Sequence, residues 1–580
     1  MTTLDENSLS NDLKSHLKNI YPENINEISD NILSIVEKYI PFALTERLDE
    51  RWDEKDILLI TYGDSIVEKE QTPLHTLNEF LHEHLSDSIS GVHILPFFPY
   101  SSDDGFSVID YKQVNPNLGG WEDINRIADK FKLMTDLVIN HISRESIWFY
   151  DFVANQLPAS EYFIEHDQDT DTSQVTRPRN SPLLIPVNTH RGTRYVWATF
   201  SEDQIDLDFS NPNVLLEFVD ILLYYIANGA RLIRLDAIAF LWKRLGTNCI
   251  HLNETHEVVK LLRDIINHVA PDCILITETN VPHEENLSYF GEGDEAHMVY
   301  QFSLPPLVLH ALNRGTAKYL TEWAASLSPL PNECTYFNFT ASHDGIGLRA
   351  LEGILPHHET EGLIESMQRF GGFVSMKANP DGEDSPYEIN ISLFDAMQGT
   401  RRGTDQWQID RFICSQSIML AMQGIPAFYI HSMLATPNDI HGVELSGRTR
   451  SINRKKWDYP ELQSLLNSQN TPNHEVFNEL KRIIEIRRNE PCFHPDNEQE
   501  IIEVNRGIFS ILRVQNTSNR KLLALYNVTA VPQQITISGK PELSDNADWH
   551  DLISNSDITT ILPLITLQPY QVMWLVDKNT

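Results

Sequence analysis

The segment GARLIRLDAIAF (residues 229–240) is a short apolar run that ends in a carboxylate, Asp236. Two further runs end in the same way: CILITETN (273–280) reaches Glu278, and TYFNFTASHDGIG (335–347) reaches Asp344. Each becomes polar at its C-terminal end, where parallel barrels carry their functional groups. A single acid in such a place is ordinarily a strand-end or N-cap residue. Three together predict a site at which acids distant in sequence converge.

The neighbours of two of these acids carry further information. Arg234 lies two residues before Asp236, and His343 comes directly before Asp344. Because side chains two positions apart on a strand point to the same face, Arg234 and Asp236 should enter one cavity. A guanidinium there would keep the carboxylate ionised and oriented. This arrangement suits a nucleophile at Asp236.

Strand and helix signals alternate along most of the chain. Strand-like segments recur, usually with an amphipathic helix between two of them, such as NVLLEFVDILLYYIANGA (213–230). This alternation predicts an α/β fold, a (β/α)8 TIM barrel. The predicted barrel strands are ILLIT (57–61), GVHIL (91–95), LMTDLVI (133–139), LIRLDA (232–237), CILITE (273–278), MVYQF (298–302), TYFNFTA (335–341) and IPAFYI (425–430).

Segments outside the barrel pattern predict additional domains. The stretch between the third and fourth strands is too long and too polar for a crossover helix, so it should form a subdomain over the site. Short alternating strands after about residue 492 predict a small antiparallel domain. The expected organisation is an N-terminal helical extension (1–54), the catalytic barrel (55–141 and 213–491), an inserted subdomain (142–212), a second insertion after the seventh strand (346–400) and a C-terminal β-domain (492–580).

Composition and charge exclude several classes of protein. A hydrophobic content of 41% is too high for general disorder, and the net charge of −37 argues against nucleic acid or an anionic membrane as a partner. No apolar run reaches the roughly 18 residues that a membrane span needs, and the N-terminus is polar without a signal-peptide core. We therefore expect a cytoplasmic location. The five cysteines lack metal-type or paired spacing and should be reduced and buried.

One segment opposes the acidic character of the chain. QVTRPRNSPLLIPVNTHRGTR (174–194) contains no Asp or Glu. A basic segment in an acidic chain predicts a binding place for a small anion, although a solvated loop paired with acidic neighbours is the alternative. Its basic residues are Arg177, Arg179, His190, Arg191 and Arg194.

Four motifs carry a family resemblance. DLVINH (136–141), RLIRLDA (231–237), ITETN (276–280) and TASHDG (340–345) resemble, in order and context, those of the α-amylase superfamily of retaining glycoside hydrolases and transglucosidases. Within it the chain is most similar to the sucrose phosphorylase group, through GVHILPFFPYSSDDGFSVIDY (91–111), FSLPPLVLHAL (302–312), SPYEINISLFDAM (385–397) and GRTRSINRKKW (447–457). The resemblance covers roughly residues 55–490.

The resemblance implies a double displacement at the anomeric carbon of glucose. Asp236 would form a β-glucosyl-enzyme, and Glu278 would protonate the leaving oxygen and later deprotonate the incoming acceptor. Asp344 would bind sugar hydroxyls and stabilise the transition state, helped by His343. The remaining glucose contacts that the resemblance implies are Asp103 and Arg450 at the terminal hydroxyl and His141 at another hydroxyl of the ring.

The acceptor side departs from the sucrose phosphorylase pattern. The loop SPYEINISLFDA (385–396) has Tyr387 at a matching position but Glu388 where glutamine is usual. Phe240 replaces the usual tyrosine, and Asn280 replaces the usual histidine. These changes argue against fructose as the acceptor, while the basic segment favours an anion.

Several phosphorylase substrates fit this pattern. The N-terminal extension, FLWKRLGTNCIHL (240–252) and RPRNSPLL (177–184) resemble glucosylglycerate phosphorylases. Glucosylglycerate therefore ranks first, sucrose 6'-phosphate second, and sucrose or glucosylglycerol third. An alternative of another class, an inactive barrel that binds a protein, would require a missing acid, and all three acids are present.

No cofactor is expected. Some amylases bind calcium near positions corresponding to Asp136, Asn140, Asp206 and Asp208, but the sucrose phosphorylase relatives do without it. No GxGxxG or GxxxxGK[ST] motif occurs, so no nucleotide cofactor is implied. The expected partners are small molecules, namely an α-glucoside, inorganic phosphate and α-glucose 1-phosphate.

Overall fold

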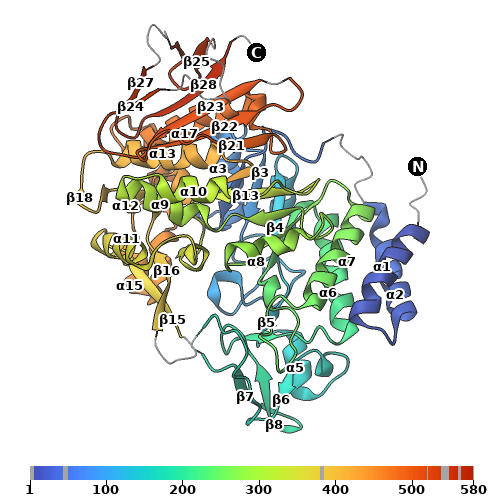
Figure 1. Ribbon diagram of the computed structural model, residues 1–580. Helices are drawn as coiled ribbons and strands as arrows, with labels where there is room; N and C mark the ends of the chain where they lie inside the picture. The colour runs from blue at the N-terminus through green and yellow to red at the C-terminus, as the bar shows by residue number, and fades with distance from the viewer. Residues whose placement is uncertain are drawn as a thin grey trace.

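The computed structural model describes residues 6–42, 50–179, 181–378, 384–518, 520–536, 548–558 and 564–578. Eight parallel strands close into a barrel in the order β1-β19-β13-β12-β11-β10-β4-β3 (Figure 1). Each predicted strand segment coincides with one of them within two residues at either end. The strands are β1 (Leu58–Thr61), β3 (Gly91–Ile94), β4 (Lys132–Val138), β10 (Ala230–Asp236), β11 (Ile274–Thr277), β12 (Met298–Tyr300), β13 (Thr335–Phe339) and β19 (Ile425–Tyr429).

The barrel strands are buried on both faces, as expected where helices surround a parallel sheet. In β10 every residue except Arg231 is buried, including Arg234 and Asp236. The helix before it, α6 (Pro212–Ala227), begins with Pro212 at its first position and with the Asn211 side chain accepting from the Asn213 N–H. These are favourable helix-start residues, so α6 begins where the inserted segment ends.

Two insertions lie at the C-terminal side of the barrel, as predicted. The first follows β4 and contains β5 (His141–Ser143), α5 (Ile147–Ala154), β6 (Glu165–His166), β7 (Leu184–Thr189), β8 (Gly192–Trp197) and β9 (Gln204–Asp206). The second follows β13 and contains the three-stranded sheet of β14 (Ile346–Gly347), β16 (Asp384–Asn390) and β15 (Phe373–Ala378), with α11 (His357–Arg369) between β14 and β15. The β6–β8 sheet and the β15–β16 hairpin project from the barrel in Figure 1.

The terminal segments flank the barrel. Helices α1 (Glu6–Ile20) and α2 (Ile25–Tyr39) pack beside α6 and α7 (Asn253–Val269), and their apolar side chains belong to the same core cluster as the barrel (Figure 1). At the other end, β21 (Glu498–Ile501), β22 (Ile508–Val514), β23 (Lys521–Asn527), β28 (Val572–Asp577), β25 (Trp549–Asp551) and β26 (Ser556–Asp557) form an antiparallel sheet. The fold is thus the predicted TIM barrel with helical and β-domain additions, whereas the exact domain boundaries stay predictions. Across the described ranges no helix is long and apolar enough to cross a membrane.

Candidate active site

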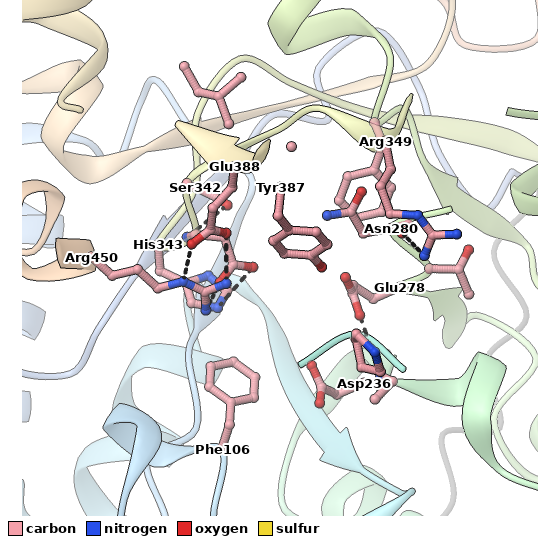
Figure 2. A pocket seen from close by; sticks show the side chains of 18 of the residues that line it. Phe106, Asp236, Glu278, Asn280, Ser342, His343, Arg349, Tyr387, Glu388 and Arg450 are labelled. Carbon is pink, nitrogen blue, oxygen red and sulfur yellow. Dashed lines mark hydrogen bonds and ion pairs between the residues drawn. The ribbon is translucent and has the colours of Figure 1, made fainter. Parts of the chain in front are cut away.

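A pocket lies over the C-terminal ends of the barrel strands, and all three predicted carboxylates line it. Two of them, Asp236 and Glu278, are labelled in Figure 2. Asp236 is the last residue of β10, Glu278 follows β11 directly, and Asp344 lies in the turn between β13 and β14. Both insertions contribute to the lining, the first through Arg179 and the second through Tyr387. The fold therefore brings acids from three strands together, as their positions in the sequence predicted.

Arg234 connects two of the three carboxylates. Its Nη1 donates to Asp236 Oδ1 at 2.7 Å, and its Nη2 lies 3.8 Å from Glu278 Oε2. The same guanidinium donates to Asp136, which His93 Nε2 contacts at 2.7 Å from the other side. Because Arg234 is 2% exposed, water does not weaken these interactions, and its position relative to Asp236 and Glu278 is fixed.

The strand end also orients Glu278. Ala237, directly after Asp236, has φ of +59°, a left-handed conformation that alanine rarely adopts. In this conformation its N–H donates to Glu278 Oε2 at 3.4 Å. Burial raises the pKa of Glu278, and the negative charge of Asp344 raises it further. Burial likewise raises the pKa of Asp236, opposed by Arg234. The negative charge of Glu278 also raises the pKa of Asp236, and two buried carboxylates that interact in this way retain a proton that isolated ones would lose.

A second group of lining residues consists of Asp103, His141, His343, Asp344 and Arg450, and we call it the inner end of the pocket. Arg450 Nη1 lies 2.6 Å from Asp344 Oδ1. Burial alone would raise the pKa of Asp344, but Arg450 and neighbouring cations hold it below its usual range. Asp344 is thus ionised at neutral pH.

Glu388 stands behind Arg450. It accepts two parallel hydrogen bonds from the guanidinium, 2.9 Å from Nε and 2.8 Å from Nη2, and it is 2% exposed. Such bidentate pairs fix both position and orientation. Glu388 therefore contacts Arg450 directly and forms, with Arg450 and Asp344, a row of alternating charges.

The two histidines of the inner end are buried and neutral. His343 stacks on Phe106 with ring centroids 4.9 Å apart and planes 7° apart, and burial lowers its pKa to about 3. His141 Nε2 donates to the Phe106 carbonyl at 2.9 Å, and burial lowers its pKa as well. Asp103 accepts from Gln204 Nε2 at 3.3 Å, which joins the first insertion to this end.

The outer end of the pocket, which we define as Arg179, Asn280, Arg349 and Tyr387, differs in character. Figure 2 shows Asn280 and Arg349 on the same side as Glu278, with Tyr387 between them and Arg450. Burial raises the pKa of Tyr387, and the positive charge of Arg179 opposes this increase. Phe240 completes the wall and packs edge-on against Phe200, with ring centroids 5.4 Å apart.

The basic segment divides between the pocket and the surface. Arg179 lines the pocket, whereas Arg177 and Arg194 do not. Arg177 is exposed. Arg194, on β8, lies 3.6 Å from Glu165 on β6, and Arg191 contacts the same carboxylate at 2.5 Å. The alternative prediction of pairing with acidic neighbours thus describes Arg191 and Arg194, and the acid comes from outside the segment.

Some lining residues were not singled out from the sequence. Phe106 lines the pocket and lies within the quoted segment 91–111. Arg454 does not line the pocket but contacts residues beside it, and it lies within the quoted segment 447–457, so the resemblance contained a signal for both. Arg454 donates to Asp104 and, from Nε, to the His343 carbonyl at 2.9 Å. Gln204 and Arg349 had no such signal, because each enters the pocket only through the folding of an insertion.

A lysine contacts two of the candidate calcium ligands, Asp206 and Asn140. Lys243 Nζ lies 2.6 Å from Asp206 Oδ2 and 2.6 Å from Asn140 Oδ1. Its side chain is 4% exposed, so the ammonium satisfies both oxygens within the protein. Among the residues that the structure describes, no group of three His, Cys, Asp or Glu side chains is arranged to hold a metal ion.

Comparisons with known proteins identify relatives of this chain. Residues 86–345 match the family model described as "Alpha amylase, catalytic domain". The chain is 47% identical to glucosylglycerate phosphorylase of Escherichia coli (strain K12), over 92% of this chain and 94% of that one. It is 42% identical to glucosylglycerate phosphorylase of Allomeiothermus silvanus, over 98% and 99%. The crystal structure of sucrose 6F-phosphate phosphorylase from Thermoanaerobacter thermosaccharolyticum superposes with a TM-score of 0.71 at 25% identity, over 82% and 94%.

Proposed function

The chain belongs to the α-amylase family and, within it, to the glucoside phosphorylases, and we propose that it transfers glucose from glucosylglycerate to inorganic phosphate, giving α-glucose 1-phosphate. The observation that supports this proposal most strongly is the pair of Asp236 and Glu278, joined through Arg234 in a pocket that also has two arginines at its outer end. Relatives with the same named activity match nearly the whole chain, which supports the choice of donor.

In the first half-reaction the Asp236 carboxylate attacks the anomeric carbon. The bond between that carbon and the glycerate oxygen breaks, and Glu278 gives its proton to the departing oxygen. The pair must hold one proton, on Glu278. Direct contact of Arg234 with Asp236 at 2.7 Å, against 3.8 Å to Glu278, favours this distribution because the cation stabilises the nearer carboxylate more.

In the second half-reaction a phosphate oxygen attacks the same carbon, and the ester to Asp236 breaks. The phosphate hydroxyl gives its proton to Glu278, which restores the starting state, and two inversions give net retention. The inner end would hold the glucose ring throughout: Asp344 and Arg450 with Asp103 at its hydroxyls, His141 at another, and His343 beside Asp344. Arg179 and Tyr387 would bind the incoming phosphate, near the position that the acceptor leaves.

The proposal is tested in the direction of synthesis. The purified protein is incubated with α-glucose 1-phosphate and glycerate, glycerol, fructose or fructose 6-phosphate, and phosphate release is measured. Release should be fastest with glycerate. Faster release with fructose 6-phosphate would assign the protein to sucrose 6'-phosphate instead, and faster loss of glucose to water than to any acceptor would make it a hydrolase. We also propose a cytoplasmic location, since all five cysteines are free and buried, as in reducing compartments.

A further inference from the structure

Arg349 lines the pocket and has no ionic partner among the residues that the structure describes. It is the first residue of a 3-10 turn (Arg349–Leu351) that follows β14, and its Nη1 donates to the Asn280 carbonyl at 3.5 Å, a long contact. Its Nε is buried and has no hydrogen-bond partner in the described part of the chain. Within the same residues no carboxylate lies within 4.0 Å of its guanidinium. A desolvated, unpaired donor of this kind is costly unless a ligand supplies the acceptor.

Asn280 presents the complementary feature. It lies two residues beyond Glu278, and its Oδ1 is buried without a donor among the described residues. Its side-chain amide rests against Gly347, where an added Cβ would come within 3.0 Å of Nδ2 and 3.1 Å of Oδ1. The glycine therefore leaves the space that this amide occupies. One unpaired donor and one unpaired acceptor thus line the pocket on the side of Glu278 (Figure 2).

The position of Arg349 is set by a small sheet. β14 pairs with β16 in the register Ile346↔Ile389 and Gly347↔Glu388, and the Leu348 N–H donates to the Tyr387 carbonyl at 3.0 Å. Arg349 is therefore carried by the same sheet as Tyr387 and Glu388. A guanidinium held in this way loses little further freedom when it binds a ligand.

We infer that Arg349 and Asn280 form the acceptor site, with the Arg349 guanidinium binding the carboxylate of a short 2-hydroxy acid and the Asn280 amide oxygen binding its free hydroxyl. The inference rests on the proposed function and assigns residues to its substrate. Glu278 protonates the leaving oxygen, so the acceptor begins there and extends toward Asn280 and Arg349, away from Arg450 and His343 (Figure 2). In a glycerate joined through its 2-oxygen, the carboxylate and the free hydroxyl both lie on carbons next to the linked one.

The charge of the site gives this assignment a physical reason. An acceptor carboxylate beside Glu278 and Asp236 meets two groups that are acidic, and repulsion from them would weaken its binding. Arg349 supplies the opposite charge on that side. Arg179 is assigned to phosphate in the proposed function, so Arg349 is the other outer-end arginine of the pocket that can bind the carboxylate of the acceptor.

The test is the acceptor preference of Arg349→Gln in synthesis from α-glucose 1-phosphate. Loss of charge-assisted hydrogen bonds should lower kcat/KM for glycerate by about 10- to 100-fold, while kcat/KM for glycerol, which has no carboxylate, changes little. Asn280→Ala should lower the preference for glycerate over lactate, which lacks the second hydroxyl, by about tenfold. Arg126→Gln is the control, since it removes the same charge from an exposed arginine on α4 (Trp121–Ala128) that pairs with Asp123 at 3.0 Å.

The outcomes separate the two proposals. If the unaltered protein does not use glycerate, the proposed function fails and this inference fails with it. If it does, but Arg349→Gln keeps the preference of glycerate over glycerol, only the inference is overturned. Should Arg349→Gln show no cooperative melting, Arg349→Lys replaces it: the point charge without the planar fork should retain part of the preference for glycerate, and full retention would overturn the assignment of the fork.

Discussion

At the inner end of the pocket charged side chains are paired with one another, whereas the two arginines of the outer end have no carboxylate partner within the described part of the chain. Arg450 contacts Asp344 at 2.6 Å and Glu388 at 2.8 Å. For Arg179 and Arg349, no ion pair exists among the residues that the structure describes. In the proposed cycle the same glucose ring takes part in both half-reactions. The inner end of the pocket, which would bind it, is held in place by contacts within the protein. In the proposed reaction the outer end would bind two different anions in turn, and its two arginines would be available to both.

This difference predicts that single substitutions can abolish the chemical step, glucose binding or acceptor preference separately. Asp236→Asn is expected to have the largest effect. Without a carboxylate nucleophile the ester cannot form, so kcat/KM for phosphorolysis should fall at least about 10⁴-fold. The measurement is formation of α-glucose 1-phosphate, with thermal melting as the check on folding. Near-normal turnover would show that Asp236 is not the nucleophile. Loss of glucose binding would show that glucose binding at the inner end depends on Asp236.

Glu278→Gln should have the next largest effect, and the effect should depend on the leaving group. Phosphorolysis of glucosylglycerate should fall by about 10²- to 10⁴-fold, with a much smaller loss for α-glucosyl fluoride, since fluoride leaves with little help from a proton. Equal losses with both donors would contradict the acid/base role.

The same residue determines an expected pH profile. Burial and the charge of Asp344 raise the pKa of Glu278, and only its protonated form can donate. The kcat/KM of the unaltered protein should therefore fall as pH rises through that raised pKa. Because glutamine does not titrate, this limb should disappear in Glu278→Gln, and its persistence would assign the proton to another group.

Glu388→Gln tests the pairing at the inner end itself. The substitution keeps the shape but removes one negative charge from a buried bidentate pair, so kcat/KM for the glucosyl donor should fall by about tenfold. Because Glu388 contacts Arg450 and not the acceptor groups, the loss should be the same for every acceptor. A changed ratio between glycerate and glycerol would mean that the two ends are coupled.

The sequence predicted the barrel and the convergence of the carboxylates because both depend on local patterns. Asp236 and Glu278 end or directly follow apolar strands, and parallel strands of a barrel end at one face. The outer end follows no such pattern. Arg349 enters the pocket only because β14 pairs with β16, a contact between residues some 40 positions apart in the chain.

The basic segment shows the same limit. Residues 174–194 contain no Asp or Glu, but this does not determine which acidic residues lie near them in the folded protein. Glu165, for example, lies outside that stretch. The folding of β6 against β8 brings this carboxylate to Arg191 and Arg194. The composition of the segment therefore predicted that some of its arginines contact an anion. Whether that anion is a bound ligand or a carboxylate of the protein depends on how the insertion packs.

The smallest expected effect concerns two arginines of the basic segment, Arg179 and Arg194. Both come from the basic segment, but one lines the pocket and the other lies near Glu165. Arg179→Ala should raise the KM for phosphate by about tenfold, because a charge-assisted contact is lost. Arg194→Ala removes a partly exposed ion pair and should change the same KM by no more than about twofold. Parallel phosphate titrations of the two variants, with glucosylglycerate saturating, measure the difference. Equal effects would mean that phosphate binding responds to the overall charge of the insertion and not to the Arg179 guanidinium in particular.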